Sequence, residues 1–195
     1  MTTRGTPGDP GGKLFCQDDS PDVRVRCRNP LTPVGPADGL KLGSADARDL
    51  GALIVLDRVC FGARAWPHPQ WREILAERSW RVTVALRSGE IAAVSVLLSG
   101  VPRAHLVSLA VAPAWRRRGV GRLLLRDAVH AASAAGARWL LLEVDGDNRD
   151  ALRLYRADGF AVSRRFREDG RARLEMVRRI SARCGRHTLA IMPSA

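Results

Sequence analysis

The sequence predicts a mixed α/β fold in which a mainly antiparallel, twisted sheet is flanked by helices. Apolar runs of strand length alternate along the chain with segments whose apolar residues recur at helical spacing. Polar turns that contain glycine separate two pairs of strand-like runs, which is typical of hairpins. The near-continuous apolar run at 139–144 indicates a strand with both faces covered. No apolar run approaches the roughly 18 to 20 residues that a membrane span needs, so we expect no membrane association.

The same patterns place the individual elements. A short extended piece at 39–42 precedes Ser44, which can cap a helix from about 45 to 61, and the Trp-Pro-His-Pro turn leads to a second helix at 70–78. The later segments are predicted as strands at 81–86, 91–98 and 105–111, a helix from Val120 to about 135, a strand at 139–144, a short helix ending at 158–159, and a hairpin of 160–166 with 171–177.

Two tryptophans lie at the turn between the first two predicted helices. Trp66 and Trp71 could cover a substrate opening or could close the hydrophobic core, and the core is the favoured interpretation.

Composition divides the chain into one domain and two ends. Residues 1–37 are rich in proline and glycine, with little to bury, and are predicted to form a disordered tail. One domain is expected over 38–180, and 181–195 is expected to be a C-terminal tail. The N-terminal segment lacks the apolar core of a secretory signal, so we expect a cytoplasmic protein. The four cysteines (Cys16, Cys27, Cys60 and Cys184) show no metal-ligand or redox spacing, which favours free thiols and no metal.

The stretch from Ser108 to Leu125 has the pattern of a phosphate-binding loop. A strand-like run is stopped by Pro113, and an arginine-glycine loop then enters a helix, whose first N–H groups and dipole favour an anion. Gly119 and Gly121 would let a ligand approach the backbone. The pattern lacks the third glycine of a dinucleotide-binding loop and the Gly-Lys-Ser/Thr of a P-loop. A surface arginine cluster beside a tight turn is the alternative.

A second group of candidate residues follows in the next strand and helix. Glu143 lies in the apolar run WLLLEV, where loss of hydration should raise its pKa and make it a better base near neutral pH. Pairing with one of the many arginines is the alternative. Tyr155 is the single tyrosine of the chain, and core packing is the alternative to a functional hydroxyl.

The spacing Arg116-x-x-Gly119-x-Gly121 after a strand resembles the coenzyme A pyrophosphate loop of the GNAT superfamily of N-acetyltransferases. Leu142-Glu143-Val144, followed by Asn148, Tyr155 and Gly159-Phe160, resembles the second half of the RimI-type ribosomal-protein alanine N-acetyltransferases. The order of the predicted elements is also that of a GNAT sheet.

The resemblance implies the roles of these residues. It implies acetyl-CoA as co-substrate without a metal, with Glu143 as general base and Tyr155 as general acid. The residues that it implies for coenzyme binding are Leu109, Ala110, Val111, Arg116, Arg117, Arg118, Gly119, Val120, Gly121, Arg122 and Asn148.

The resemblance implies acetyl transfer to a protein N-terminal α-amine. A ribosomal protein is one candidate acceptor, so ribosome association is an expected partnership. The final hairpin departs from the subfamily because residues 163–170 contain no tyrosine to hold a peptide. One alternative is acetylation of a small amine, either a metabolite or an antibiotic. The net charge of +12, carried almost wholly by arginine, leaves a non-catalytic nucleic-acid-binding module as another. The same charge disfavours polyamines and aminoglycosides as acceptors.

Overall fold

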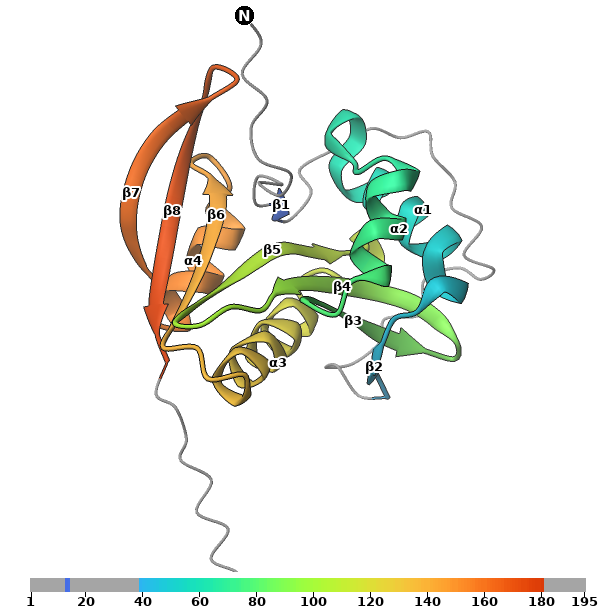
Figure 1. The fold of residues 1–195 in the computed structure, drawn as a ribbon. Helices are drawn as coiled ribbons and strands as arrows, with labels where there is room; N and C mark the ends of the chain where they lie inside the picture. The colour runs from blue at the N-terminus through green and yellow to red at the C-terminus, as the bar shows by residue number, and fades with distance from the viewer. Residues whose placement is uncertain (1–12, 15–38, 181–195) are drawn as a thin grey trace, which may run out of the picture.

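The computed structural model describes residues 13–14 and 39–180, and it has one twisted sheet with helices on both faces (Figure 1). Along the sheet the strands follow the order β2-β3-β4-β5-β6-β8-β7. Neighbours on this path are antiparallel except β5 and β6, which are parallel. The predicted fold class is thus confirmed. The strands are β2 (Lys41–Ser44), β3 (Trp80–Arg87), β4 (Glu90–Leu98), β5 (Arg103–Val111), β6 (Trp139–Asp145), β7 (Ala161–Glu168) and β8 (Arg171–Arg179).

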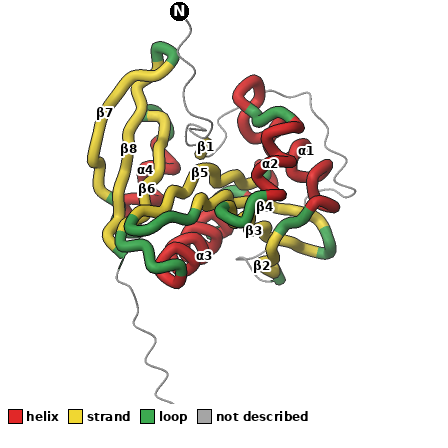
Figure 2. The backbone as a smooth tube through the Cα atoms, in the orientation of Figure 1, coloured by secondary structure: helices red, strands yellow, loops and turns green. Residues whose placement is uncertain are grey.

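Four α-helices in the described part of the chain cover the sheet. They are α1 (Leu50–Phe61), α2 (His68–Ala76), α3 (Val120–Ala134) and α4 (Arg149–Ala157). Side chains of α1 and α2 form one core with alternate residues of the sheet, such as Val84, whereas side chains of α3 and α4 pack with the intervening residues, such as Ala85. The two pairs of helices therefore lie on opposite faces (Figures 1 and 2).

The start of the first helix differs from the prediction. A 3₁₀ turn (Ala47–Asp49) precedes α1, and the N-cap of this turn is Asp46 rather than Ser44. The Arg48 N–H donates to Asp46 Oδ1 over 2.8 Å, and the Asp46 N–H donates to Asp49 Oδ2 over 2.9 Å, which is a reciprocal cap. Ser44 instead ends β2, opposite Thr83. The second helix begins at His68, two residues earlier than predicted, because Pro69 fits its first turn.

The sheet opens in its middle. β5 and β6 pair only from Arg103↔Trp139 to Leu106↔Leu142, so the last residues of both strands diverge. The short strand β1 (Lys13–Leu14) lies along this part of β5, with its backbone parallel to Ser108 and Leu109 (Figure 1). The other residues of the two predicted tails lie outside the described residues, and the domain limits at 38 and 180 stay predictions.

A buried carboxylate fixes the connection between α1 and α2. Trp66 and Trp71 are buried with their rings edge to face, 5.1 Å between centroids, which confirms the favoured core interpretation. Asp57 of α1 is also buried, and its Oδ2 accepts from the Trp66 N–H (2.5 Å) and from Trp71 Nε1 (3.3 Å). This single side chain therefore ties α1 to the loop that follows it and to α2.

We expect Asp57→Ala to lower the free energy of unfolding by about 3 kcal/mol, because two buried N–H donors lose a charged acceptor. Urea denaturation measures the change. The matched control Asp147→Ala removes an exposed carboxylate and should change stability by less than about 0.5 kcal/mol. Equal stabilities of the two variants would contradict the role of Asp57.

Candidate active site

The end of β5 presents backbone groups to the opening. The Ala112 N–H donates to the Ala92 carbonyl of the β4 side over 3.0 Å. Because backbone groups alternate along a strand, those of Ala110 also point to β4, whereas those of Leu109 and Val111 point toward the opening. Of the three strand residues predicted to contact the coenzyme, two therefore have backbone groups on the edge that borders the opening, although β1 lies along Leu109 and the Val111 carbonyl accepts from side chains. The third contributes its backbone to the sheet.

The loop after β5 enters α3 as predicted, with α3 beginning at Val120. Two residues of this loop adopt left-handed backbone conformations, Arg117 with φ 62° and Gly119 with φ 81°. A Cβ at Gly119 would meet no atom within 4 Å, so the backbone angle is the reason that glycine suits this position. Gly119 is the N-cap and supplies no side-chain cap, so nothing of its own blocks the first N–H groups of the helix.

The four arginines predicted to contact the coenzyme, three in the loop and Arg122 in the first turn of α3, have different surroundings. Arg116 Nε donates to the Val111 carbonyl over 3.2 Å, which ties the loop to the end of β5. Arg117 pairs with Asp150 at 3.0 Å, and Arg122 lies 3.6 Å from Asp158. The guanidinium of Arg118 lies 5.5 Å from the centroid of the Trp115 ring. The start of α3 is thus surrounded by Arg117, Arg118 and Arg122. Arg116 instead bonds to the backbone of β5.

Asp150 on α4 has its acidity shifted by an arginine of its own helix and by one from this loop. A hydrogen bond from Arg153, together with the charge of Arg117, holds the pKa of Asp150 below its ordinary value. Asp150 therefore stays ionised at neutral pH, and it joins the start of α3 to the start of α4.

Cys60 also contacts the end of β5. This buried thiol donates to the Val111 carbonyl over 3.5 Å, and burial raises its pKa to about 11. A thiol with that pKa carries little thiolate at neutral pH, so it is a poor nucleophile. The other three cysteines lie outside the described residues.

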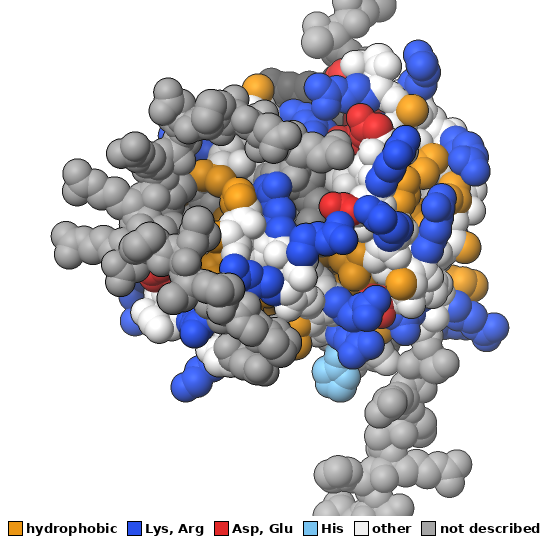
Figure 3. Space-filling view, turned by 180° about the vertical axis from the view of Figure 1, so that it is seen from behind, with side chains coloured by type: hydrophobic (Ala, Val, Ile, Leu, Met, Phe, Trp, Pro, Cys, Tyr) orange, Lys and Arg blue, Asp and Glu red, His pale blue; other side chains and the backbone are white. Residues whose placement is uncertain are grey.

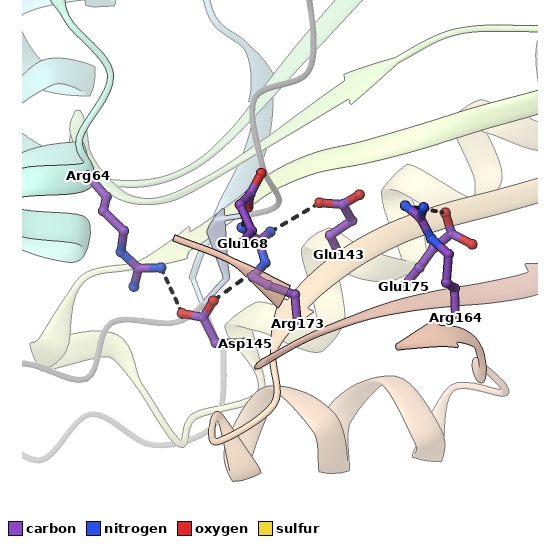
Figure 4. Close-up of polar contacts among 7 residues, drawn as sticks. All are labelled: Arg64, Glu143, Asp145, Arg164, Glu168, Arg173 and Glu175. Carbon is purple, nitrogen blue, oxygen red and sulfur yellow. Dashed lines mark hydrogen bonds and ion pairs between the residues drawn. The ribbon is translucent and has the colours of Figure 1, made fainter. Parts of the chain in front are cut away.

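Glu143 lies on the α1–α2 face of the sheet. Its neighbours Leu142 and Val144 are buried in the core formed with α3 and α4, so the intervening carboxylate points to the opposite face. Its side chain is 19% exposed, and Glu143 Oε2 lies 3.2 Å from the guanidinium of Arg173 on β8 (Figure 4). Pairing of Glu143 with an arginine, the alternative that the sequence left open, is therefore present. An adjacent cation favours the ionised form, opposite to the effect of burial, and the raised pKa of Glu143 stays a prediction.

Tyr155 is a residue of α4, and its side chain lies in the core on the other face of the sheet. It is fully buried, and its ring meets Phe160 edge to face with 5.7 Å between centroids. Within the described part of the chain its hydroxyl has no hydrogen-bond partner. Burial raises the pKa of this phenol well above its ordinary value, so the group stays protonated. An unpartnered buried hydroxyl costs stability, and a polar atom of a ligand could satisfy it.

Asn148 has a structural role that the sequence analysis missed. It is the N-cap of α4, and its Oδ1 accepts from the Ala151 N–H over 3.1 Å. The cap pattern, an asparagine directly before the helical residues, was the available signal. Its coenzyme contact stays a prediction.

The sequence analysis also missed a charged network around Glu143. Arg173 lies 3.6 Å from Asp145 and contacts Glu168. Asp145 in turn pairs at 2.7 Å with Arg64, which comes from the connection between α1 and α2 (Figure 4). Arginines are so frequent here that no sequence signal distinguished these two from the rest.

Within the described residues no cluster of three or more His, Cys, Asp or Glu side chains could hold a metal ion. No helix described between 39 and 180 is long and apolar enough to cross a membrane.

Comparison with known proteins identifies the class. A model of the acetyltransferase (GNAT) family matches residues 52–160, so the chain belongs to this family, whose members use acetyl-CoA as co-substrate. The structure of the ribosomal-protein-S18-alanine N-acetyltransferase from Escherichia coli superimposes with a TM-score of 0.67 at 24% identity, covering 73% of this chain and 94% of that one. That likeness shows the shared fold.

Two curated relatives differ in the molecules for which they are named. The mycothiol acetyltransferase of Thermobifida fusca is 29% identical over 176 residues, which are 83% of this chain and 52% of that protein. The [ribosomal protein bS18]-alanine N-acetyltransferase of Escherichia coli K12 is 34% identical over 74 residues, 38% of this chain and 50% of that protein. The aligned regions thus span about half the length of each relative.

We expect the only tyrosine to titrate in the folded protein well above its unfolded pKa of about 10. Between these pKa values the folded state holds a proton that the unfolded state has lost, so the free energy of unfolding must fall as the pH rises above about 10. Tyrosinate absorbance, followed in buffer and in urea, measures both states. Identical titrations while the protein remains folded would contradict the burial of Tyr155.

Proposed function

We propose that this protein transfers the acetyl group of acetyl-CoA to a primary amine, with a protein N-terminal α-amine as the acceptor. The observation that carries the proposal is the opening between β5 and β6, which has Glu143 on one face of the sheet and the unpartnered Tyr155 hydroxyl in the core of the other. A thioester that reaches through the opening would meet a base and an acid from opposite sides.

The residues around the opening fit acetyl-CoA. The pairing of β1 along Ser108 and Leu109 supports the view that an extended chain fits this edge of β5, as a pantetheine arm would. That arm and β1 would use the same edge, so coenzyme binding would displace Lys13–Leu14. The pyrophosphate would lie at the start of α3, where free N–H groups, the helix dipole and exposed arginines attract an anion.

The chemistry needs two proton transfers. The neutral amine attacks the thioester carbon, and the Val111 N–H, which faces the opening, can stabilise the developing oxyanion. Glu143 takes the proton that the nitrogen releases as the N–C bond forms. The C–S bond then breaks, and Tyr155, which burial keeps protonated, supplies a proton to the thiolate of coenzyme A.

The choice of acceptor rests on acidity and on the relatives. An α-amine has a pKa of roughly 8, whereas a lysine amine has one of roughly 10, so far more of the α-amine is neutral at pH 7. The relative named for ribosomal protein bS18 supports a protein N-terminus. The relative named for mycothiol, whose match covers 83% of this chain, supports a small-molecule acceptor as the second candidate.

A nucleic-acid-binding role has weaker support. On the face drawn in Figure 3, the Lys and Arg side chains lie beside hydrophobic and acidic ones rather than in one continuous stripe. Several of them pair with carboxylates, including Arg64, Arg117 and Arg153. A basic surface divided in this way offers less to a continuous phosphate backbone.

We expect acetyl-CoA to raise the melting temperature, and Arg117→Glu/Arg118→Glu to remove most of the rise. The two substitutions reverse charge at the start of α3, where the pyrophosphate is proposed to bind, and ligand stabilisation follows affinity. The control Arg165→Glu/Arg167→Glu makes the same charge change on exposed positions of β7. Thermal scans with and without acetyl-CoA measure both variants. An equal loss in the control would assign the effect to overall charge.

An acceptor screen tests the proposed function. Release of coenzyme A is followed with peptides that begin with alanine or serine, with small amines including mycothiol precursors, and with polyamines and aminoglycosides. We expect the peptides to be acetylated on residue one, as located by mass spectrometry. Tyr155→Phe and Glu143→Gln should lower turnover by about 10²-fold or more. Tyr155→Phe should leave the free energy of unfolding unchanged or raise it, since the hydroxyl has no partner in the described chain.

Each outcome of this screen has a distinct meaning. Efficient turnover of small amines without peptide activity would move the assignment to the second candidate. Parental rates in both variants would return Glu143 and Tyr155 to packing roles. Retention of RNA in a salt-sensitive manner, without release of coenzyme A, would favour the nucleic-acid-binding role.

A further inference from the structure

We propose that Arg173 is a positioning residue for acetyl transfer, which holds the Glu143 carboxylate ionised and fixed beside the β5–β6 opening. The inference rests on the proposed function in one respect only, which is the use of Glu143 as base. The contact between the two side chains is a feature of the fold itself.

The burial of Arg173 is the first observation. Its side chain is only 8% exposed, although it carries a permanent charge. A buried guanidinium is costly unless carboxylates surround it. Here Glu143 lies 3.2 Å away and Asp145 3.6 Å away, and Glu168 makes the third contact. A single cation thus joins carboxylates from β6 and β7.

The sheet register fixes where this cation lies. Arg173 stands opposite Asp145 on β6 and opposite Phe166 on β7, so its strand is paired on both sides. Its guanidinium also lies 5.9 Å from the centroid of the Phe166 ring. A planar guanidinium with several N–H donors holds its acceptors at set angles, which a lysine ammonium does not. Glu143 therefore has a fixed position before any substrate binds.

The charges around Glu143 explain the effect on ionisation. The described charged groups on this side of the sheet include Arg173, Asp145, Glu168, Glu175 and Arg64, with Arg164 and Arg171 farther along the last hairpin. Glu175, opposite Glu143 in the register, accepts from the Ser163 hydroxyl and lies 4.0 Å from Arg164, so it has partners of its own. Arg64 pairs with Asp145 rather than with Glu143. Arg173 is thus the described cation that pairs with Glu143, and its charge offsets that of the nearby carboxylates.

This arrangement has a consequence for the reaction. A base can accept the amine proton only while it is ionised, and both burial and neighbouring carboxylates work against ionisation. Arg173 opposes both effects. It therefore extends the pH range over which Glu143 can act, and it keeps the carboxylate from turning toward solvent.

The test is a carboxyl titration by ¹³C NMR on the full-length protein, with the Glu143 resonance assigned by Glu143→Gln. In Arg173→Met the pKa of Glu143 should rise by about one unit or more, and in Arg173→Lys by less. The control Arg164→Met removes an arginine that is 60% exposed and pairs with Glu175, and it should leave the Glu143 titration unchanged. Unchanged titration in a folded Arg173→Met variant overturns the proposal. If that variant does not fold, an unchanged titration in Arg173→Lys does so.

Kinetics give an independent readout. Arg173→Lys should lower kcat about tenfold or more, with little change in the Kd for acetyl-CoA. Combined with Glu143→Gln, it should add little further loss, because residues that act through one another are not additive. Full additivity would overturn the proposal. The titration needs no acetyl transfer, so an inactive wild-type protein with a shifted titration would refute the proposed function and leave the Arg173–Glu143 link supported.

Discussion

Hydrogen bonding between β5 and β6 stops at Leu106 and Leu142, and this early end of pairing shapes the candidate site. Each strand keeps its other edge paired, β5 with β4 and β6 with β8, so both are held in place while their inner edges separate. Backbone groups on those edges still need hydrogen-bond partners. β1 fills this need along Leu109 in the structure, and the proposed coenzyme arm would fill it during the reaction. This edge of β5 is therefore the place where we propose that the coenzyme arm binds.

The opening also separates the two candidate catalytic groups. Residues of β6 alternate between faces, which puts Glu143 among charged groups on the α1–α2 face. Tyr155 comes from α4, which packs on the other face, and its side chain is buried in the apolar core there. The surroundings of Glu143 and of Tyr155 have opposite effects on the ionisation of the two side chains. A cation beside Glu143 favours loss of its proton, whereas burial keeps the proton on Tyr155. These are the states that a base and an acid require.

An ion pair connects the loop between α1 and α2 to the same site. Asp57 fixes this loop from the core by accepting from Trp66 and Trp71, so the indoles pack inward and do not line an opening. Arg64 of the loop meets Asp145 at the end of β6, next to Arg173. A buried hydrogen bond in one layer thus supports an ion-pair network at the sheet opening, and the network links four segments of the chain.

The order of the elements, the turn at Gly119 and the start of α3 were predictable without coordinates, because they depend on local periodicity and on backbone angles. Tyr155 could also be singled out, since a lone tyrosine at a family spacing is visible in the sequence. The arginine that meets Glu143 could be found only in the folded sheet. Arg173 is 30 residues away along the chain, and no local pattern distinguishes it from its neighbours. Asn148 is an intermediate case. Its position directly before a helix was visible in the sequence, but the residue was interpreted as a coenzyme contact rather than as the N-cap of α4. Ion pairs between strands depend on register and burial, which only the folded sheet defines.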